Sequence, residues 1–220
     1  MFGVARSKAK PKSKAKAKPK AKAKAKPKPK SSRLSGSVDA IIAKLAAAVA
    51  ANPDPTYAST HGFLDGALVT GKQLDATRKP YPPSFRDAVI AHGLFSLGDT
   101  DAAHSQLVFR CWPLAQHRSA LAEYADQLGC EPTADAVSEE IGVNAELVGA
   151  LEQLILIGVE GHEDYVGFDL RTRNTKTGEC RFGLVLFDDT EIDALANEAT
   201  RPCAERGFDA WLAKHVARRA

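Results

Sequence analysis

The sequence predicts an α+β protein with a mostly antiparallel β-sheet flanked by helices, preceded by a disordered arm rich in Lys, Ala and Pro. Three observations lead to this prediction. Segments rich in β-branched and aromatic residues follow one another after position 154, separated by turn residues, as in an antiparallel sheet. In the chain that follows the arm, apolar residues recur with helical spacing near both ends. Residues 7–33 alternate lysine with small residues or proline and cannot build a core.

The arm divides the charge of the chain into two parts. Residues 1–33 hold 14 basic and no acidic side chains, whereas the other 187 residues hold 16 basic and 27 acidic ones, a net charge of −11. Because closely spaced lysines repel one another and prolines interrupt helices, we expect a disordered polybasic tail over 1–36, followed by one domain over 37–220. Such tails bind nucleic acid non-specifically or act as solubilising tethers, and both uses stay open. The possible nucleic-acid contacts are Lys8, Lys10, Lys12, Lys14, Lys16, Lys18, Lys20, Lys22, Lys24, Lys26, Lys28 and Lys30.

The first half of the domain predicts two helices. Apolar residues follow helical spacing over 38–51, and Asn52-Pro53 ends the pattern. Residues 53–82 are rich in turn formers, with a strand or short helix expected near 63–69. Pro82-Pro83 opens the second helix, which Gly93 ends.

The second half predicts alternating helices and strands. The expected order is a strand at 105–112, a helix at 113–128, short helices at 133–141 and 144–154, strands at 154–160, 164–172 and 180–188, and a closing helix at 208–220. The aromatic residues at core-facing positions, Trp112 and Trp211 among them, are interpreted as packing residues. None is interleaved with basic residues as in a base-stacking surface. Cys111 is likewise expected to be a small core residue.

Acidic residues gather in the segment IGVEGHEDYVGFDL, residues 157–170. It holds Glu160, His162, Glu163, Asp164 and Asp169. Catalytic carboxylate pairs lie across a cleft, and a calcium loop needs alternating ligands with a glycine at a fixed place, which this segment lacks. We therefore predict a solvated turn between two strands. The alternative is an acidic edge that faces a partner.

Three segments together resemble a known family. YPPSFRDAVIAHG at 81–93 is a proline-led helix that ends at glycine. LILIGVEGHEDYVGFDLRTRNTKTGECRFGLVLFDD at 154–189 is a run of strands with a short acidic turn and an FDL strand, and GFDAWLAKHV at 207–216 is a closing helix. In this order and spacing they resemble the SUKH superfamily, over roughly residues 80–217.

The resemblance implies a non-enzymatic α+β domain that binds proteins. Many bacterial members of the superfamily are immunity proteins that neutralise toxins, often nucleases, and eukaryotic members are regulatory interaction proteins. Two features depart from the family pattern. The lysine arm is not a family feature, and the helical stretch at 113–152 is longer than the family leads one to expect.

The first functional hypothesis is therefore a protein-binding module, an immunity-type inhibitor of a toxin such as a basic nuclease. An acidic body would steer toward a basic partner. The expected partner-binding acidic residues are Glu160, Glu163, Asp164, Asp188, Asp189 and Glu191. We expect a cytoplasmic protein with reduced thiols and no membrane span, cofactor, metal or small-molecule substrate.

The second hypothesis is a nucleic-acid-associated regulator that binds DNA non-specifically through its arm. Residues 132–154 also have the order of a helix-turn-helix, but their second helix carries Glu146 and Glu152 and no basic residue, so phosphates would repel it. The third hypothesis, an enzyme, finds no support, because the six histidines are scattered and no phosphate loop, nucleophile elbow or metalloprotease motif occurs.

Overall fold

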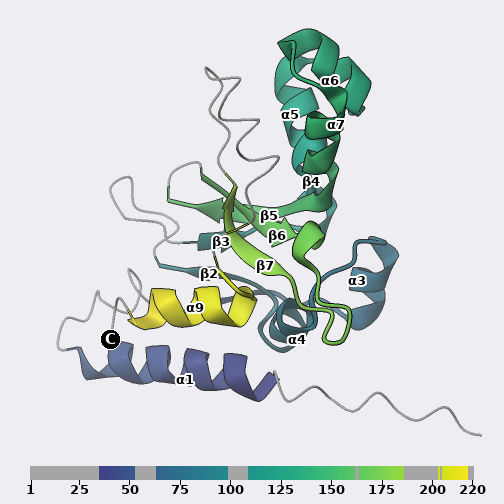
Figure 1. Cartoon of the computed structure of the whole chain (residues 1–220). Coiled ribbons are helices and arrows are strands. Elements are labelled where there is room, and N and C mark those ends of the chain that lie inside the picture. The colour runs from purple at the N-terminus through teal and green to yellow at the C-terminus, as the bar shows by residue number, and fades with distance from the viewer. Residues whose placement is uncertain are drawn as a thin grey trace, which may run out of the picture. The chain divides into compact units, whose positions relative to one another are not determined.

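An antiparallel β-sheet lies at the centre of the fold (Figure 1). The computed structural model describes residues 35–52, 63–98, 109–161, 164–185, 203 and 205–217. Within these residues, seven α-helices accompany a seven-stranded sheet, which confirms the predicted α+β class. The predicted tail lies outside the described residues, except that the first helix already begins at Ser35, two residues before the expected boundary.

The strand order explains how distant segments meet. The strands are β1 Phe63–Ala67, β2 Leu94–Leu97, β3 Phe109–Cys111, β4 Arg118–Ser119, β5 Leu154–Glu160, β6 Asp164–Asp169 and β7 Arg181–Val185. They are arranged β1-β2-β3-β5-β6-β7, and each described pair is antiparallel. β4 also pairs with β5, so β3 and β4 share one edge of β5 while β6 occupies the other.

The β5–β6 hairpin confirms that the acidic segment turns between two strands. Glu160 pairs with Asp164 next to the turn, in which Gly161 adopts a φ of 66°. Positions 162 and 163 of the turn lie outside the described residues. Side chains of β5 alternate between two cores, because Ile155 and Ile157 belong to a first core and Leu154 and Leu156 to a second. β5 is therefore buried on both faces.

The first core lies between one face of the sheet and three helices. These helices are α1 Ser35–Ala51, α4 Pro83–His92 and α9 Phe208–Ala217. Figure 1 shows α1 running beside α9, and all three helices contact the sheet, α1 at β1, α4 at β2 and α9 at β7. Aromatic rings fill this core, and those fully or almost fully buried are Phe85, Phe95, Phe109, Phe168, Phe182, Phe208 and Trp211.

A close backbone approach joins α4 to the sheet. Gly93 ends α4 with a φ of 74°, and a Cβ at this position would lie 2.4 Å from the carbonyl oxygen of Gly66 in β1. Only glycine permits both the left-handed conformation and this distance. The chain thus passes directly from α4 into β2, which starts at Leu94.

The second core lies under three short helices that we call the helical lobe, residues 120–153. It comprises α5 Ala120–Leu128, α6 Ala134–Ile141, α7 Ala145–Gly149 and a 3-10 helix at Ala150–Gln153. Ser119, Thr133 and Asn144 each cap one helix N-terminus by accepting a backbone hydrogen bond. Val137, Val148 and Leu151 are completely buried and pack with Leu154 and Leu156 of β5.

The structure corrects the start of the helix predicted over 113–128. α5 begins only at Ala120, because residues 112–119 follow the edge of β5. The Trp112 amide donates to the Ile157 carbonyl at 2.8 Å, a 3-10 turn at Leu114–Gln116 leaves the edge, and β4 returns to it. Pairing with β5 thus overrides the helical periodicity of this segment.

Besides β4, two short elements are missing from the sequence-based prediction. β2 has only four residues, and α3 Gly71–Ala76 only six. α3 nevertheless carries a signal, the capping box between Thr70 and Gln73, in which each side chain accepts from the backbone of the other. Two predicted strands are described in part, since positions 105–108 and 186–188 lie outside the described residues.

We expect Trp211→Ala to lower the free energy of unfolding by about 3–5 kcal/mol, because it removes a large side chain that is 2% exposed and packs against Phe109 and Phe182. Chemical denaturation of the full-length protein measures this loss. Ile90→Ala is the control, because Ile90 is 44% exposed and its truncation should cost less than about 1 kcal/mol. Equal losses in the two variants would contradict the placement of α9 on the core.

Candidate functional site

Of the six acidic residues predicted to bind a partner, the structure describes two, Glu160 and Asp164. Asp164 is exposed at the start of β6. Glu160 instead serves the fold: one carboxylate oxygen accepts a hydrogen bond from Trp211 Nε1 at 3.3 Å, and the other lies 3.4 Å from His215 Nε2. Its side chain is 20% exposed. Glu163, Asp188, Asp189 and Glu191 lie outside the described residues, as do the twelve arm lysines from Lys8 to Lys30.

His215 takes part in the same contact. Its ring is buried against Trp211, with 4.5 Å between the ring centroids. Glu160 therefore fastens α9 to the end of the β5–β6 hairpin through two side chains one helical turn apart. This carboxylate contributes to stability more than to surface charge.

Negative charge is concentrated in one part of the sequence, the helical lobe and its flanking strands. Residues 111–170 contain twelve acidic side chains and a single Lys or Arg, which is Arg118. Their net charge of −11 equals that of the whole chain after the arm, so residues 34–110 and 171–220 nearly balance their own charges. A local count along the sequence would have found this segment, whereas the total for the domain conceals it.

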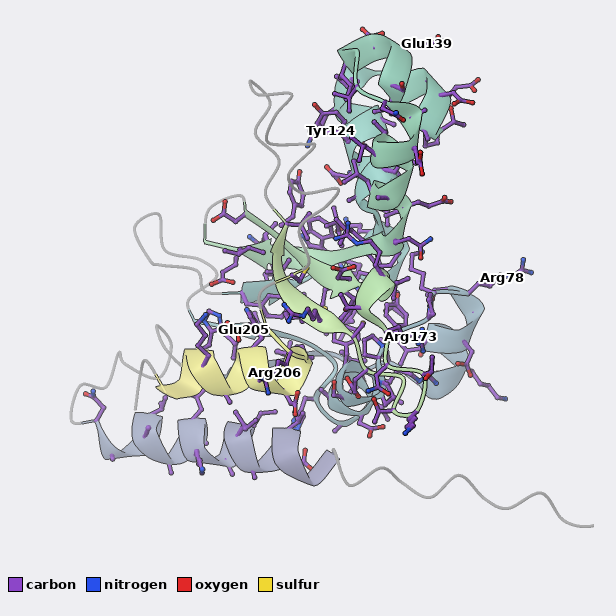
Figure 2. The ribbon with its side chains drawn as sticks, viewed as in Figure 1. Arg78, Tyr124, Glu139, Arg173, Glu205 and Arg206 are labelled. Carbon is purple, nitrogen blue, oxygen red and sulfur yellow. The ribbon has the colours of Figure 1, made fainter. Side chains whose placement is uncertain are left out.

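Within the helical lobe there are eight acidic residues and no basic ones. Seven of them are exposed, namely Asp126, Glu131, Asp135, Glu139, Glu140, Glu146 and Glu152. Figure 2 shows Glu139 at the end of the lobe farthest from the sheet. Among the described residues no group of three or more His, Cys, Asp or Glu side chains converges as metal ligands would. The lobe therefore presents a broad negative field, which attracts a cationic surface.

The eighth acidic residue, Glu123, is buried at the junction of the lobe with the sheet. One of its oxygens accepts from the Tyr165 hydroxyl at 2.8 Å, and the other accepts from Arg118 Nε. Arg118 Nη1 also donates to Asp126 at 3.1 Å, and Gln127 donates to the Tyr165 hydroxyl at 3.2 Å. Burial, followed by the hydrogen bond to Glu123, raises the pKa of Tyr165 to about 12. This network ties α5 to β4 and β6.

A second polar cluster, Tyr81, Cys111 and His117, lies inside the protein. His117 is 1% exposed, and its Nε2 lies 2.9 Å from the Trp112 carbonyl oxygen, which can only accept. Nε2 therefore carries the proton, and Nδ1 accepts from the Tyr81 hydroxyl at 2.8 Å. The Cys111 sulfur lies 3.9 Å from Nε2.

The electrostatics of this cluster suit packing and not nucleophilic chemistry. Burial lowers the pKa of His117 to about 4 and raises the pKa of the Cys111 thiol far above its usual value. A thiolate–imidazolium pair needs shifts in the opposite directions. The cluster instead fixes the 3-10 turn between β3 and β4, and the prediction that Cys111 is a small core residue is confirmed.

With this geometry established, we compared the chain with known proteins. No family model, curated protein or solved structure matched it. In the part of the chain that the structure describes, no helix has both the length and the hydropathy required to cross a bilayer.

The lowered pKa of His117 predicts a pH-dependent stability. Its pKa of about 4 in the folded protein lies below the unfolded value of 6.5, so the contribution is complete above pH 6.5 and is lost as the pH falls toward 4. We expect a loss of about 3 kcal/mol over this range. The measurement is denaturant unfolding from pH 7.5 to 4, with His117→Gln as the reference. Parallel stability curves for the two proteins would contradict the assignment.

Proposed function

We propose that this protein is a non-enzymatic, cytoplasmic protein-binding module of the SUKH-like immunity type, which neutralises a basic toxin, such as a nuclease, by docking its helical lobe on it. The observation that carries the proposal is the concentration of charge: eight acidic residues and no basic residue within residues 120–153. Surfaces that serve solubility alone intersperse both signs of charge. A field of one sign is the arrangement that steers a partner of the opposite sign.

The construction of the lobe supports this proposal. Like charges on three short helices repel one another and lower stability, yet caps at each N-terminus and a core shared with β5 hold the helices in place. The exposed carboxylates thus stand on a fixed backbone, so a partner would meet them without a large entropic cost of ordering. An inhibitor of a nuclease has to cover a basic substrate groove, and a rigid acidic projection suits that task.

The lobe also coincides with one of the two departures from the family pattern. The stretch at 113–152, which is longer than the SUKH resemblance leads one to expect, includes α5, α6 and α7. A segment added between the strands of a binding domain is a natural place for partner specificity, since loops and insertions carry function on a stable scaffold.

Neutralising the lobe tests this function. We expect the triple variant Glu139→Gln, Glu140→Gln, Glu146→Gln to weaken binding to the natural partner on the order of tenfold, because three exposed charge pairs are lost. The partner is recovered with immobilised full-length protein from lysate of the cells that encode it and identified by mass spectrometry. Its affinity for each variant is then measured by calorimetry, and inhibition of nuclease activity is assayed where it has one.

The control changes the same number of charges elsewhere: Asp188→Asn, Asp189→Asn, Glu191→Gln. Binding that survives in the control and weakens in the lobe variant supports the lobe. Binding that survives in the lobe variant and weakens in the control would overturn the lobe as the binding surface, in favour of the acidic residues predicted from sequence. Recovery only of partners without basic character would contradict the proposal as a whole.

The lysine arm supports a second candidate function, non-specific binding of nucleic acid. Twelve lysines at every even position from 8 to 30, without an acidic residue among them, provide sequence-independent phosphate contacts. We expect the full-length protein to retain a DNA duplex at low salt and to release it steeply as salt rises, and a chain without residues 1–33 to lose this binding. Filter binding at several salt concentrations measures both. Equal retention by the truncated chain would exclude the arm as the contact.

A further inference from the structure

A hollow opens where the helical lobe meets the sheet. Its volume is about 280 Å³, and it is lined by Trp112, Ala115, Gln116 and Arg118, which we call the junction hollow. The lining residues come from the edge segment between β3 and β4, which the buried His117 holds in place. This volume lies just below the ~300–1,000 Å³ of pockets for drug-sized ligands, and a single side chain of a partner fits within it.

An aromatic ring and a surplus of negative charge meet at this place. Trp112 is half-buried and packs edge-to-face on Tyr165, with 5.7 Å between the ring centroids. The charge of Arg118 is already balanced by Glu123 and Asp126, which both accept hydrogen bonds from its guanidinium. The three charged groups sum to −1, and the Asp126 side chain is 70% exposed.

These features favour a cation over an anion. An anionic ligand at Arg118 would have to displace or approach two carboxylates and enter the field of the lobe. A cation in the hollow would lie against Trp112, the residue type best suited to cation–π contact, and near Asp126, whose carboxylate lies 3.1 Å from Arg118 Nη1. A planar guanidinium can stack on the indole and hydrogen-bond to Asp126 at the same time, which an ammonium cannot do as well.

We propose that the junction hollow receives an arginine side chain of the protein partner, stacked on Trp112 and paired with Asp126. The inference rests on the proposed function, because it assigns an anchor point within the same binding surface. The lobe supplies long-range attraction, and the hollow supplies the fixed contact that decides which basic surface stays bound. Trp and Arg are the residue types enriched at such anchor points of interfaces.

The test uses the full-length protein labelled with ¹⁵N and the probe peptide acetyl-Gly-Arg-Gly-amide. The chain has two tryptophans, and Trp211 is buried in the first core, so the two indole N–H signals report on separate places. Trp112→Leu identifies the Trp112 signal by its disappearance. We expect this signal to shift saturably with the arginine peptide and the Trp211 signal to stay unchanged. The same peptide with citrulline, which keeps the shape of arginine without its charge, should bind at least about fivefold more weakly.

Matched protein variants separate the hollow from the general field of the lobe. Asp126→Asn should weaken binding of the arginine peptide about threefold to fivefold, whereas Glu139→Gln, which removes the same charge at the far end of the lobe, should leave it unchanged. Equal effects of the two variants, equal binding of the citrulline peptide, or no saturable shift at Trp112 would each overturn the proposal.

The outcome is independent of the test of the proposed function. A partner that is lost from the lobe variant but binds the Asp126→Asn and Trp112→Leu proteins normally would leave the protein-binding function standing and overturn the hollow as its anchor. If the hollow binds the arginine peptide but no partner depends on the lobe, the hollow stands as an arginine site and the proposed function of the lobe is overturned.

Discussion

Strand β5 is the constraint on which the other elements depend. It pairs with three strands, β3 and β4 on one edge and β6 on the other, and its side chains alternate between two cores. Ile155 and Ile157 belong to the aromatic core under α4 and α9, while Leu154 and Leu156 form the floor of the helical lobe. A shift of one residue in its register would exchange these two sets and disrupt both cores together.

This double role also explains how an acidic lobe stays attached to the sheet. Surface ion pairs contribute at most about 1 kcal/mol each, and the lobe carries no basic residue with which to form one internally. Each apolar side chain that the second core buries contributes roughly 1.5–3 kcal/mol, and Val137, Val148, Leu151, Leu154 and Leu156 are all buried there. Apolar burial therefore outweighs charge repulsion, and the surface charge of the lobe is free to vary with the partner.

The sequence predicts the elements whose signal is local and misses those that depend on distant pairing. The boundaries of β5 and the glycine-containing turn after it follow from composition and turn chemistry, and the structure confirms them. The start of α5 cannot be predicted locally, because residues 113–119 have a helical pattern and only their pairing with β5 shows that the helix begins later. In the sequence, Glu160 looks like an ordinary surface carboxylate, because its partners Trp211 and His215 lie 51 and 55 positions farther along the chain. Charge, in contrast, is fully visible in the sequence, but it becomes informative only when it is counted segment by segment.

The position of the junction hollow follows from the same constraint. β3 and β4 both pair with β5, so the five residues between Trp112 and Arg118 must leave the sheet edge and return to it within a short distance. Pro113 and the 3-10 turn provide the excursion, and the buried His117 closes it by hydrogen-bonding to the Trp112 carbonyl. Trp112 and Arg118 thereby line the same gap, the junction hollow. A rigid gap of this kind, at the base of an acidic projection, restricts a partner in position as well as in charge, and shape is what turns electrostatic attraction into specificity.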